Sequence, residues 1–179
     1  MTGRAVLALP DPPLVDAAAG IVLRPWRTTP GDVAALAAAW DDPDVAATSA
    51  PPADRSAAAA ERWIAGAPGR LAAGLALDLV ITGRDGGVLG EVGLRNLDAG
   101  RRRAELGWWV AAPHRGRGLA GVAVGLVAGW ALGPPCGLRQ VWARIVPGNA
   151  ASAAVARRAG LVRLGTAAGT EVWARSAAA

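Results

Sequence analysis

The stretch RAELGWWVAAPHRGRGLAGVAVGLVAGWAL, residues 103–132, decides the fold. Residues 103–111 alternate as a half-buried strand does, residues 114–120 hold two glycines and two arginines, and residues 121–132 are apolar nearly all round, as a buried helix is. A strand that passes through a glycine-containing turn into a helix aims several backbone N–H groups and the positive end of the helix dipole at one point. Such a point binds anions. The stretch therefore predicts an α/β protein with a phosphate-binding turn near its middle.

The strand 103–111 is expected to present two different faces. Its alternation places Glu105, Gly107 and Trp109 on one face. The other face carries an apolar series: Ala104, Leu106, Trp108 and Val110. We expect the apolar face to pack on the helix that follows.

Periodicity and turn residues predict the elements upstream of this stretch. They are a strand at 21–26, a helix at 29–42 with Thr29 as N-cap, a helix at 53–67 with Asp54 as N-cap, and a hairpin of strands 75–83 and 88–96 around an Asp-Gly turn. Residues 1–19 contain three prolines and are expected to form a loose extension.

Downstream, the sequence predicts a second set of elements. They are a strand at 138–146, a short helix from the cap Asn149 to the stop Gly160, and a last hairpin of strands 161–167 and 170–176. The resulting order is β-α-α-β-β-β-α-β-α-β-β. It describes one α/β domain over residues 20–176, with a mixed central sheet flanked by helices.

The composition excludes several kinds of chemistry. The chain has 179 residues and contains no lysine, tyrosine or phenylalanine. The 19 residues that could be lysine or arginine are therefore all arginine, and the eight tryptophans are the aromatic residues among Phe, Trp and Tyr. This bias is typical of a GC-rich bacterial genome. It rules out a tyrosine acid and a lysine nucleophile. Cys136 is the only cysteine, so an intrachain disulfide and a cysteine-based zinc site are excluded, and no metal is expected.

The charge distribution and the lengths of the apolar runs indicate which partners and which cellular location to expect. The net charge is +5, but the arginines are scattered and the one dense run, Arg101 to Arg103, is typical of a solvated loop. We therefore expect no nucleic-acid partner. No apolar run is long enough to cross a membrane, and the N-terminus lacks the apolar region of a signal peptide. A cytoplasmic location with no membrane contact is the expectation.

Two familiar phosphate-binding motifs do not fit the turn. A P-loop needs a lysine, and the chain has none. The string GRGLAG, residues 116–121, matches a dinucleotide-binding fingerprint literally. However, it follows the fourth predicted strand instead of the first, and no acidic residue follows a second parallel strand.

The turn and its surroundings resemble the GNAT family of acetyl-CoA-dependent N-acetyltransferases. Residues 115–120, RGRGLA, are similar to that family's Q/R-x-x-G-x-G/A signature at a strand-to-helix turn. Downstream, Asn149, Ser152 and the pair Gly160-Leu161 resemble its N-x-x-S-x-x-x-x-x-x-G-F segment, with leucine in place of phenylalanine. The segments LRPW, DDPDV and AELGWWV are similar to the ribosomal-protein N-acetyltransferase (RimJ/RimL-like) branch. The resemblance covers about residues 20–176.

The resemblance implies acetyl-CoA as co-substrate and assigns residues to it. The backbone amides of the turn would hold the diphosphate, with charge added by two arginine side chains: Arg115, Gly116, Arg117, Gly118, Leu119 and Ala120. The edge of the fourth strand at Val110, Ala111 and Ala112 would pair with the pantetheine arm. Asn149 would contact the pantetheine or only cap its helix. His114, just before the turn, is expected to be a solvated loop residue.

The resemblance also implies a direct attack of a primary amine, from a protein N-terminus or a small molecule, on the thioester. Glu105 is the candidate base, with a pKa raised by burial beside tryptophans, although it could instead only pair with an arginine such as Arg103. Ser152 is the candidate acid toward the leaving thiolate, and the Val110 N–H the candidate oxyanion donor.

Further expectations concern the acceptor cleft, an alternative function and the oligomeric state. Trp109 would line the acceptor cleft, while Asp41, Asp42 and Asp44 either border that cleft or form a polar loop. The alternative function is a non-catalytic acyl-CoA-binding or regulatory module. Homodimers are common in the resembled family, so the resemblance allows for one.

Overall fold

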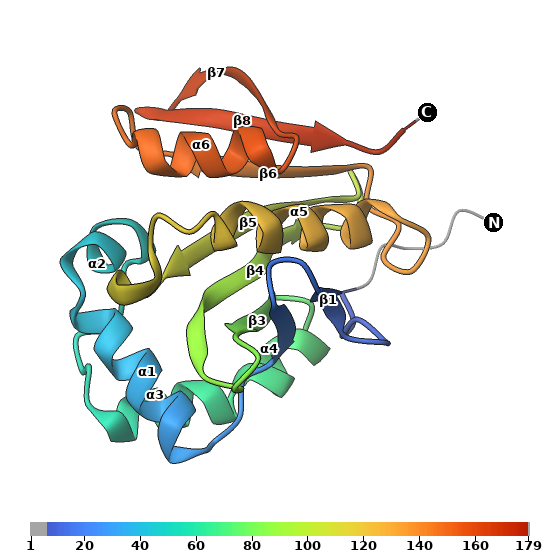
Figure 1. The fold of residues 1–179 in the computed structure, drawn as a ribbon. Coiled ribbons are helices and arrows are strands. Elements are labelled where there is room, and N and C mark those ends of the chain that lie inside the picture. The colour runs from blue at the N-terminus through green and yellow to red at the C-terminus, as the bar shows by residue number, and fades with distance from the viewer. Residues whose placement is uncertain (1–6, 179) are drawn as a thin grey trace.

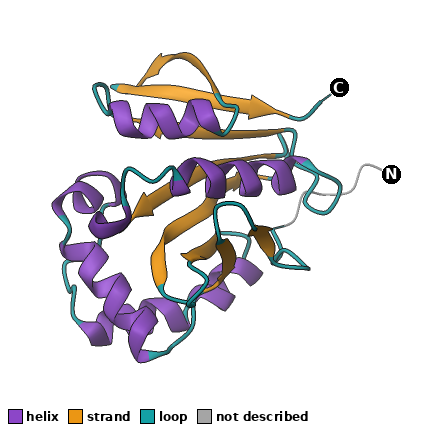
Figure 2. Ribbon diagram, viewed as in Figure 1, coloured by secondary structure: helices purple, strands orange, loops and turns teal. Residues whose placement is uncertain are grey.

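The computed structural model describes residues 7–178, which form one open eight-stranded mixed sheet with helices on both faces (Figures 1 and 2). The strands are β1 (Leu14–Asp16), β2 (Ile21–Pro25), β3 (Ala76–Thr82), β4 (Val88–Asp98), β5 (Arg103–Val110), β6 (Gln140–Ile145), β7 (Val162–Ala167) and β8 (Thr170–Ser176). The helices are α1 (Pro30–Asp41), α2 (Pro43–Ser49), α3 (Ala57–Ala65), α4 (Ala67–Ala72), the 3-10 turn η1 (Ala112–His114), α5 (Leu119–Leu132) and α6 (Ala150–Arg158).

The sheet has the strand order β1-β2-β3-β4-β5-β6-β8-β7. Neighbouring strands from β1 to β5 are antiparallel, as are β6, β8 and β7. The one parallel pair is β5 with β6, joined through α5. The mixed sheet predicted from the sequence is thereby confirmed.

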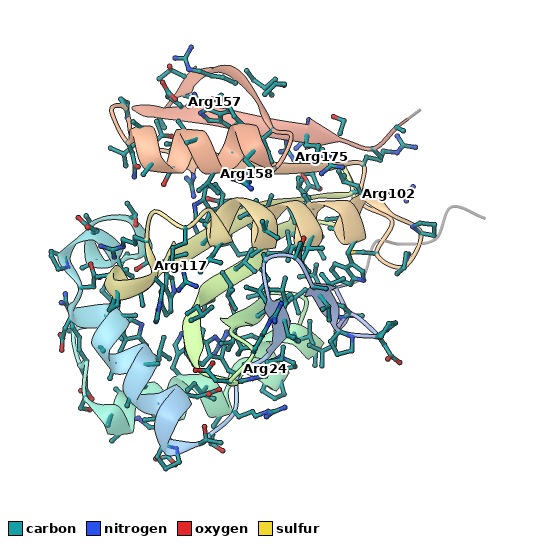
Figure 3. All side chains as sticks on the ribbon, in the orientation of Figure 1. Arg24, Arg102, Arg117, Arg157, Arg158 and Arg175 are labelled. Carbon is teal, nitrogen blue, oxygen red and sulfur yellow. The ribbon has the colours of Figure 1, made fainter. Side chains whose placement is uncertain are left out.

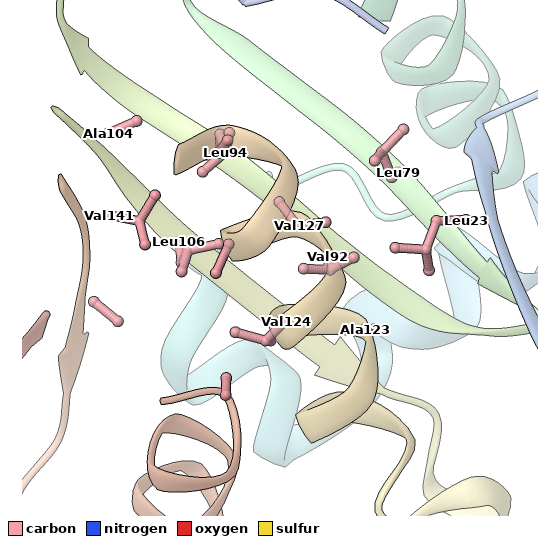
Figure 4. Close-up of a cluster of buried hydrophobic side chains, with 14 of the residues drawn as sticks. Leu23, Leu79, Val92, Leu94, Ala104, Leu106, Ala123, Val124, Val127 and Val141 are labelled. Carbon is pink, nitrogen blue, oxygen red and sulfur yellow. The ribbon is translucent and has the colours of Figure 1, made fainter. Parts of the chain in front are cut away.

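Two hydrophobic clusters hold the helices to the two faces of the sheet. On one face, α5 and α6 cover the apolar side chains of the central strands; Figure 4 shows Val124 and Val127 of α5 above Val92, Leu94 and Leu106. On the other face, α1 and α3 bring apolar side chains onto the sheet: Leu36, Trp40 and Ile64, which pack with Val80 and Trp109. The two faces predicted for β5 are thus both used, each by a different helical layer.

The side chain of Cys136 lies in the first of these clusters, between α5 and β6. It is buried, and burial raises the pKa of its thiol to about 11.

The element bounds follow the predictions closely from β2 onward, including both hairpins and the caps at Thr29 and Asn149. The Thr29 hydroxyl accepts from the Asp32 N–H at 3.3 Å, and the Asn149 side chain accepts from the Ser152 N–H at 2.9 Å. The predicted cap of α3 is wrong, because Ser56 caps that helix. Asp54 instead accepts from the Ser56 N–H and pairs with Arg62.

Three short elements differ from the expectation. The helix α2 lies where a loop was expected. The helix α4 begins where the helix expected at 53–67 ends, and it continues beyond that point. In the predicted N-terminal extension, β1 pairs with β2 and Leu7 is buried in the core, so residues 7–19 are not loose; residues 1–6 lie outside the described residues.

The arginine run occupies the hairpin turn between β4 and β5, as predicted. Arg101 and Arg103 both pair with Asp98, and Arg102 donates to the Gly137 carbonyl. Within residues 7–178, no helix is long and apolar enough to span a membrane.

Candidate active site

The sheet opens between β5 and β6. The two strands pair only at their beginnings, from Arg103 with Gln140 to Glu105 with Trp142, although β5 continues to Val110 and β6 to Ile145 (Figure 1). Along the same length, β5 stays paired with β4 on its other side. The second half of β5 therefore has one edge without a strand partner.

Alternation of the ladder shows which groups face that opening. The Ala111 N–H donates to the Leu89 carbonyl of β4, and hydrogen-bonded positions alternate along an antiparallel pair. The backbone groups of Trp108 and Val110 therefore point away from β4 and into the opening. On this edge the Trp108 groups and the Val110 N–H are available to an extended chain, whereas the Val110 carbonyl accepts from Arg115. The Ala111 N–H is bound to β4, so the expected pairing of Ala111 with a ligand is not supported. Ala112 lies in the turn η1 instead, so the strand edge ends before it.

The turn after β5 is built as an anion site. Gly116 and Gly118 have φ values of 73° and 75°, in the left-handed region that favours glycine. Gly118 is the N-cap of α5, and no side chain caps that helix. Its first N–H groups therefore remain available to a ligand at the positive end of the helix dipole. Nothing lies within 4 Å of a Cβ built on Gly116, so the turn is open to a bulky anion.

The side chain of Arg115 does not serve this turn. Its two terminal nitrogens lie 2.6 Å from Asp42 and Asp44 of α2, and its Nε donates to the Val110 carbonyl at 2.9 Å. The expectation that the Arg115 guanidinium assists the anion is therefore not met. Arg117 is exposed, with one terminal nitrogen 3.5 Å from the Nδ1 of His114.

A second arginine, Arg158 of α6, takes a place that the sequence analysis did not anticipate. A Cβ on Gly118 would lie 2.9 Å from its terminal nitrogen, and one on Gly121 would lie 2.5 Å from its Cδ. Arg158 thus extends from α6 across the first turn of α5 (Figure 3).

A cavity of about 290 Å³ lies on the sheet face below α2 and reaches the opening between β5 and β6. Residues 106–109 of β5 line it from one side, and Ile145 of β6 with the following Val146 from the other. Ser152 of α6 and its N-cap Asn149 line it too, and the Ser152 backbone N–H donates to the Asn149 side-chain oxygen. Both predicted α6 residues therefore reach the same cavity.

The first of the two alternatives for Asp41, Asp42 and Asp44, that they border the acceptor cleft, is wrong. The cavity is lined by the C-terminal residues of α2: Ala47, Thr48 and Ser49. Asp42 and Asp44 instead bind Arg115, and Asp41 lies 3.8 Å from Arg55. Trp109 does line the cavity, as expected.

Glu105 reaches the cavity but is held in an ion-pair network. Its carboxylate is 1% exposed and accepts from the Asn96 side chain at 2.6 Å, from Arg95 at 3.2 Å and from Arg144 at 3.1 Å. Burial alone would raise the pKa of Glu105, but the Asn96 hydrogen bond and the charges of the two arginines outweigh it and lower the pKa. The expected rise of its pKa is therefore wrong. The alternative, a pairing with an arginine, is confirmed, but the partners are Arg95 and Arg144, whereas Arg103 binds Asp98.

Glu91 of β4 is the carboxyl group in the cavity whose pKa lies near neutrality. Burial, together with the negative charge of Asp78, raises the pKa of Glu91 to about 7. The indole N–H of Trp26 donates to it at 2.7 Å, and Trp26 stacks near Trp109 and Trp63 with ring centroids 6.3 and 6.4 Å away. The sequence analysis missed Glu91. The signal was an acidic residue within the apolar strand LGEVGL, directly opposite Trp109.

These features together define a class of protein. They fit the binding of an acyl-coenzyme A. The features are an uncapped helix terminus behind an open glycine turn, an unpaired strand edge, and a cavity with a carboxyl group whose pKa is near neutral. The turn can hold the diphosphate, the strand edge the pantetheine, and the cavity the acyl group with its acceptor. Residues 7–178 contain no group of three or more His, Cys, Asp or Glu that could hold a metal ion.

Comparison with known proteins specifies the family. The sequence model of the acetyltransferase (GNAT) domain matches residues 21–162, so the chain belongs to the GNAT family of acetyl-CoA-dependent N-acetyltransferases. A search of curated proteins finds no match.

Solved structures of acetyltransferases share the fold. RimJ of Mycobacterium smegmatis, in complex with CoA-disulfide, is 24% identical with a TM-score of 0.74, over 89% of this chain and 83% of that chain. The ribosomal-protein-S5-alanine acetyltransferase of Vibrio fischeri is 16% identical with a TM-score of 0.74, over 88% and 93%. The spermidine N-acetyltransferase of Vibrio cholerae, in complex with CoA and spermine, is 14% identical with a TM-score of 0.72, over 88% and 96%.

Proposed function

We propose that the protein transfers the acetyl group of acetyl-CoA to a primary amine by direct attack, with Glu91 as the general base. The observation that carries this proposal is the cavity. It places Glu91, whose pKa is about 7, on the same hollow as the unpaired edge of β5. An amine is mostly protonated at neutral pH, so a base of this pKa is suited to accept its proton.

The co-substrate is held mainly by backbone groups. N–H groups of residues 116–120 bind the diphosphate at the N-terminus of α5, and the exposed Arg117 and Arg158 side chains add positive charge. The Trp108 and Val110 edge pairs with the pantetheine arm. Asn149 faces the same cavity, which favours a contact with the pantetheine in addition to its role as a cap.

The reaction then needs three proton and electron movements. Glu91 takes a proton from the ammonium group of the acceptor, directly or through a water molecule. The freed amine nitrogen attacks the acetyl carbonyl while the Val110 N–H donates to the developing oxyanion. When the C–S bond breaks, the Ser152 hydroxyl gives its proton to the thiolate and takes up, through water, the second proton that the nitrogen loses. The products are the neutral amide and the coenzyme thiol, and Glu91 releases its proton to solvent. Glu105 keeps Arg95 and Arg144 in place instead of acting as the base.

The neighbours show that this fold serves different amines. One is named for the alanine of a ribosomal protein and another for spermidine. The fold therefore leaves the acceptor open, and for this chain the proposal covers primary amines as a class.

Turnover of acetyl-CoA with a panel of amines tests the proposal, comparing Glu91→Gln with Glu61→Gln as a control for an exposed glutamate on α3. We expect the Glu91 variant to lose about a hundredfold or more in kcat and to keep its affinity for acetyl-CoA within about twofold, with the control unchanged. Tight acetyl-CoA binding without turnover of any amine would instead identify a non-catalytic acyl-CoA-binding module.

A further inference from the structure

The floor of the cavity is made of two glycines. Gly93 of β4 lies opposite Gly107 of β5, and both line the cavity. A Cβ on Gly93 would approach the Leu77 carbonyl oxygen to 2.6 Å, so the close packing of β3 requires glycine there. Neither glycine projects a side chain into the cavity, and the Arg95 guanidinium lies over Gly107, so the space for a small molecule lies between Glu91 and this guanidinium.

One end of this floor is acidic. Glu91 lies two residues before Gly93 on the same face of β4, and Asp78 of β3 lies beside Gly93 in the ladder. Asp78 is already paired with Arg70 at 3.0 Å, which leaves Glu91 as the carboxyl group at this end without an arginine partner among the described ion pairs. This end suits the ammonium group of an acceptor.

The other end carries an excess of positive charge. Arg95 and Arg144 both bind the single carboxylate of Glu105, which is buried, so the three groups together have a net charge of +1. The two arginine side chains remain 46% and 48% exposed, and both line the cavity. Each guanidinium has more donors than the Glu105 carboxylate occupies. This end suits an anion.

From these two ends we infer that the acceptor is a small primary amine that carries a carboxylate, such as an amino acid. Its amine lies at Glu91, and its carboxylate lies on Arg95 and Arg144. The inference rests on the proposed function, which it narrows from amines in general to carboxylated ones. The cavity, about 290 Å³, holds a small molecule of this kind.

The spacing of the two ends supports a short acceptor. The Arg95 guanidinium bends back over Gly107, since its Cζ lies 3.4 Å from a Cβ built on that glycine. Gly107 pairs with Gly93, and Gly93 is two residues from Glu91, or about 7 Å along the strand. Only a few atoms can separate the amine from the carboxylate in a molecule that spans this distance.

Other amines fit the charges less well. A peptide N-terminus has an amide where an amino acid has its carboxylate, so it leaves the two guanidinium groups without an anion. A polyamine places a second cation against them, which is repulsive.

Matched substrates test the inference on the wild-type enzyme. The probes are free leucine and phenylalanine, their amides, the corresponding decarboxylated amines, spermidine, and short peptides that begin with the same residues. We expect kcat/KM to be at least about tenfold higher for the free amino acids than for their amides or decarboxylated amines. Equal or higher values for the amides, peptides or spermidine would overturn the inference while leaving the proposed function intact.

Two variants locate the carboxylate. Arg95→Gln should lower kcat/KM for amino acids at least about tenfold, mainly through KM, and change the decarboxylated amines less than about twofold. Arg101→Gln, which removes an exposed arginine paired with Asp98, is the matched control and should change neither. Arg144→Gln gives a second test should the first variant not fold. An equal loss on both substrate classes would show a structural role and contradict the inference.

Failure of the proposed function has a different signature. If no amine of any class is acetylated while acetyl-CoA still binds, the proposed function fails and the inference fails with it. If amines are acetylated without preference for a carboxylate, only the inference fails.

Discussion

Glu91 and Glu105 lie on adjacent strands and line one cavity, yet the structure gives them opposite acidities. Glu105 accepts from Asn96 and two arginines, so its charged form is stabilised. Glu91 receives indole N–H groups of Trp26 and Trp109 and is in no ion pair among residues 7–178, so burial dominates and its pKa rises. Partners, more than depth of burial, decide which of the two carboxyl groups can act as a base.

The raised pKa of Glu91 predicts a pH-dependent stability. Its native pKa of about 7 lies above the unfolded value of 4.5, so its stabilising contribution is complete below pH 4.5 and is lost as the pH rises through 7. Between pH 5 and pH 8, the unfolding free energy of the wild type should therefore fall relative to that of Glu91→Gln, by at most about 3 kcal/mol. Urea titrations at the two pH values measure it. A difference that does not change with pH would contradict the raised pKa.

At this scale, the sequence predicted which residues share a face but not which carboxyl group is reactive. The alternation of residues 103–111 placed Glu105 beside Trp109 correctly. However, it could not reveal Arg144, which is 39 residues further along the chain and reaches Glu105 only through the pairing of β5 with β6. The same limit applies to Arg115, whose partners are Asp44 in α2, a helix that the sequence did not predict, and Asp42, the N-cap of that helix.

Among the elements, α5 carries the anion site through its backbone, which predicts an effect of charge in the turn. Gly116→Asp places a carboxylate where we propose that the diphosphate binds, in open space and at a left-handed φ of 73°. We expect the affinity for acetyl-CoA to fall about a hundredfold or more, measured by calorimetry. Gly86→Asp, in the β3–β4 turn, is the matched control, because Gly86 also has a positive φ of 81° and open space. Unchanged affinity of the Gly116 variant would exclude this turn as the phosphate site.

The helix α6 allows its cap and its cofactor contact to be separated. Asn149→Asp keeps the capping acceptor, whereas Asn149→Ala removes it and should cost about 1 kcal/mol of stability. If Asn149 also binds the pantetheine through its amide N–H₂, both variants should weaken acetyl-CoA binding several-fold, although only the alanine variant is destabilised. Normal affinity in the aspartate variant would restrict Asn149 to capping.

Elements with strong hydrophobic periodicity or clear turn and cap residues could be predicted from the sequence, and short elements could not. The segment 121–132 and both hairpins stand out in the sequence and appear as expected, in α5 and in the pairs β3–β4 and β7–β8. The helices α2 and α4 have seven and six residues, begin with proline near their first position and contain mostly small residues. Their stability comes from packing on α1 and β3, which local sequence does not encode.

For the whole molecule, the divergence of β5 and β6 is the feature on which the site depends. The two strands share only three paired positions, so the β6–β8–β7 half of the sheet is joined to the other half by a short ladder and by α5 and α6 (Figure 1). A chain-like ligand that pairs along the open edge would add contacts between the two halves. Binding should therefore stabilise the complete fold.

This stabilisation predicts a thermal shift that depends on the pantetheine arm. At a concentration one hundred times its Kd, acetyl-CoA should stabilise the protein by about 2.7 kcal/mol, which corresponds to a rise in Tm of about 5–10 °C. 3′-Phosphoadenosine 5′-diphosphate keeps the diphosphate and lacks the arm, and at the same molar concentration it should give a clearly smaller rise in a calorimetric scan. Equal shifts would mean that the open edge contributes nothing to binding.

The sequence predicted the order of the elements and the mixed character of the sheet, but not its opening. The order follows from local patterns, and the turn after residue 111 with the buried helix behind it required a parallel return strand. Where β5 and β6 separate depends on how α5, α6 and the β6–β8–β7 layer pack, which is a property of the assembled chain. The location of the cavity, and hence of Glu91, followed only from that arrangement.

The burial of Cys136 has a practical consequence for following turnover. A thiol with a pKa of about 11, shielded under α5, is a poor nucleophile toward aromatic disulfide dyes at neutral pH. Cys136 is also the only sulfhydryl in the 179-residue chain. Each acetyl transfer liberates one coenzyme thiol, so a colorimetric thiol titration should count product continuously against almost no background from the enzyme itself.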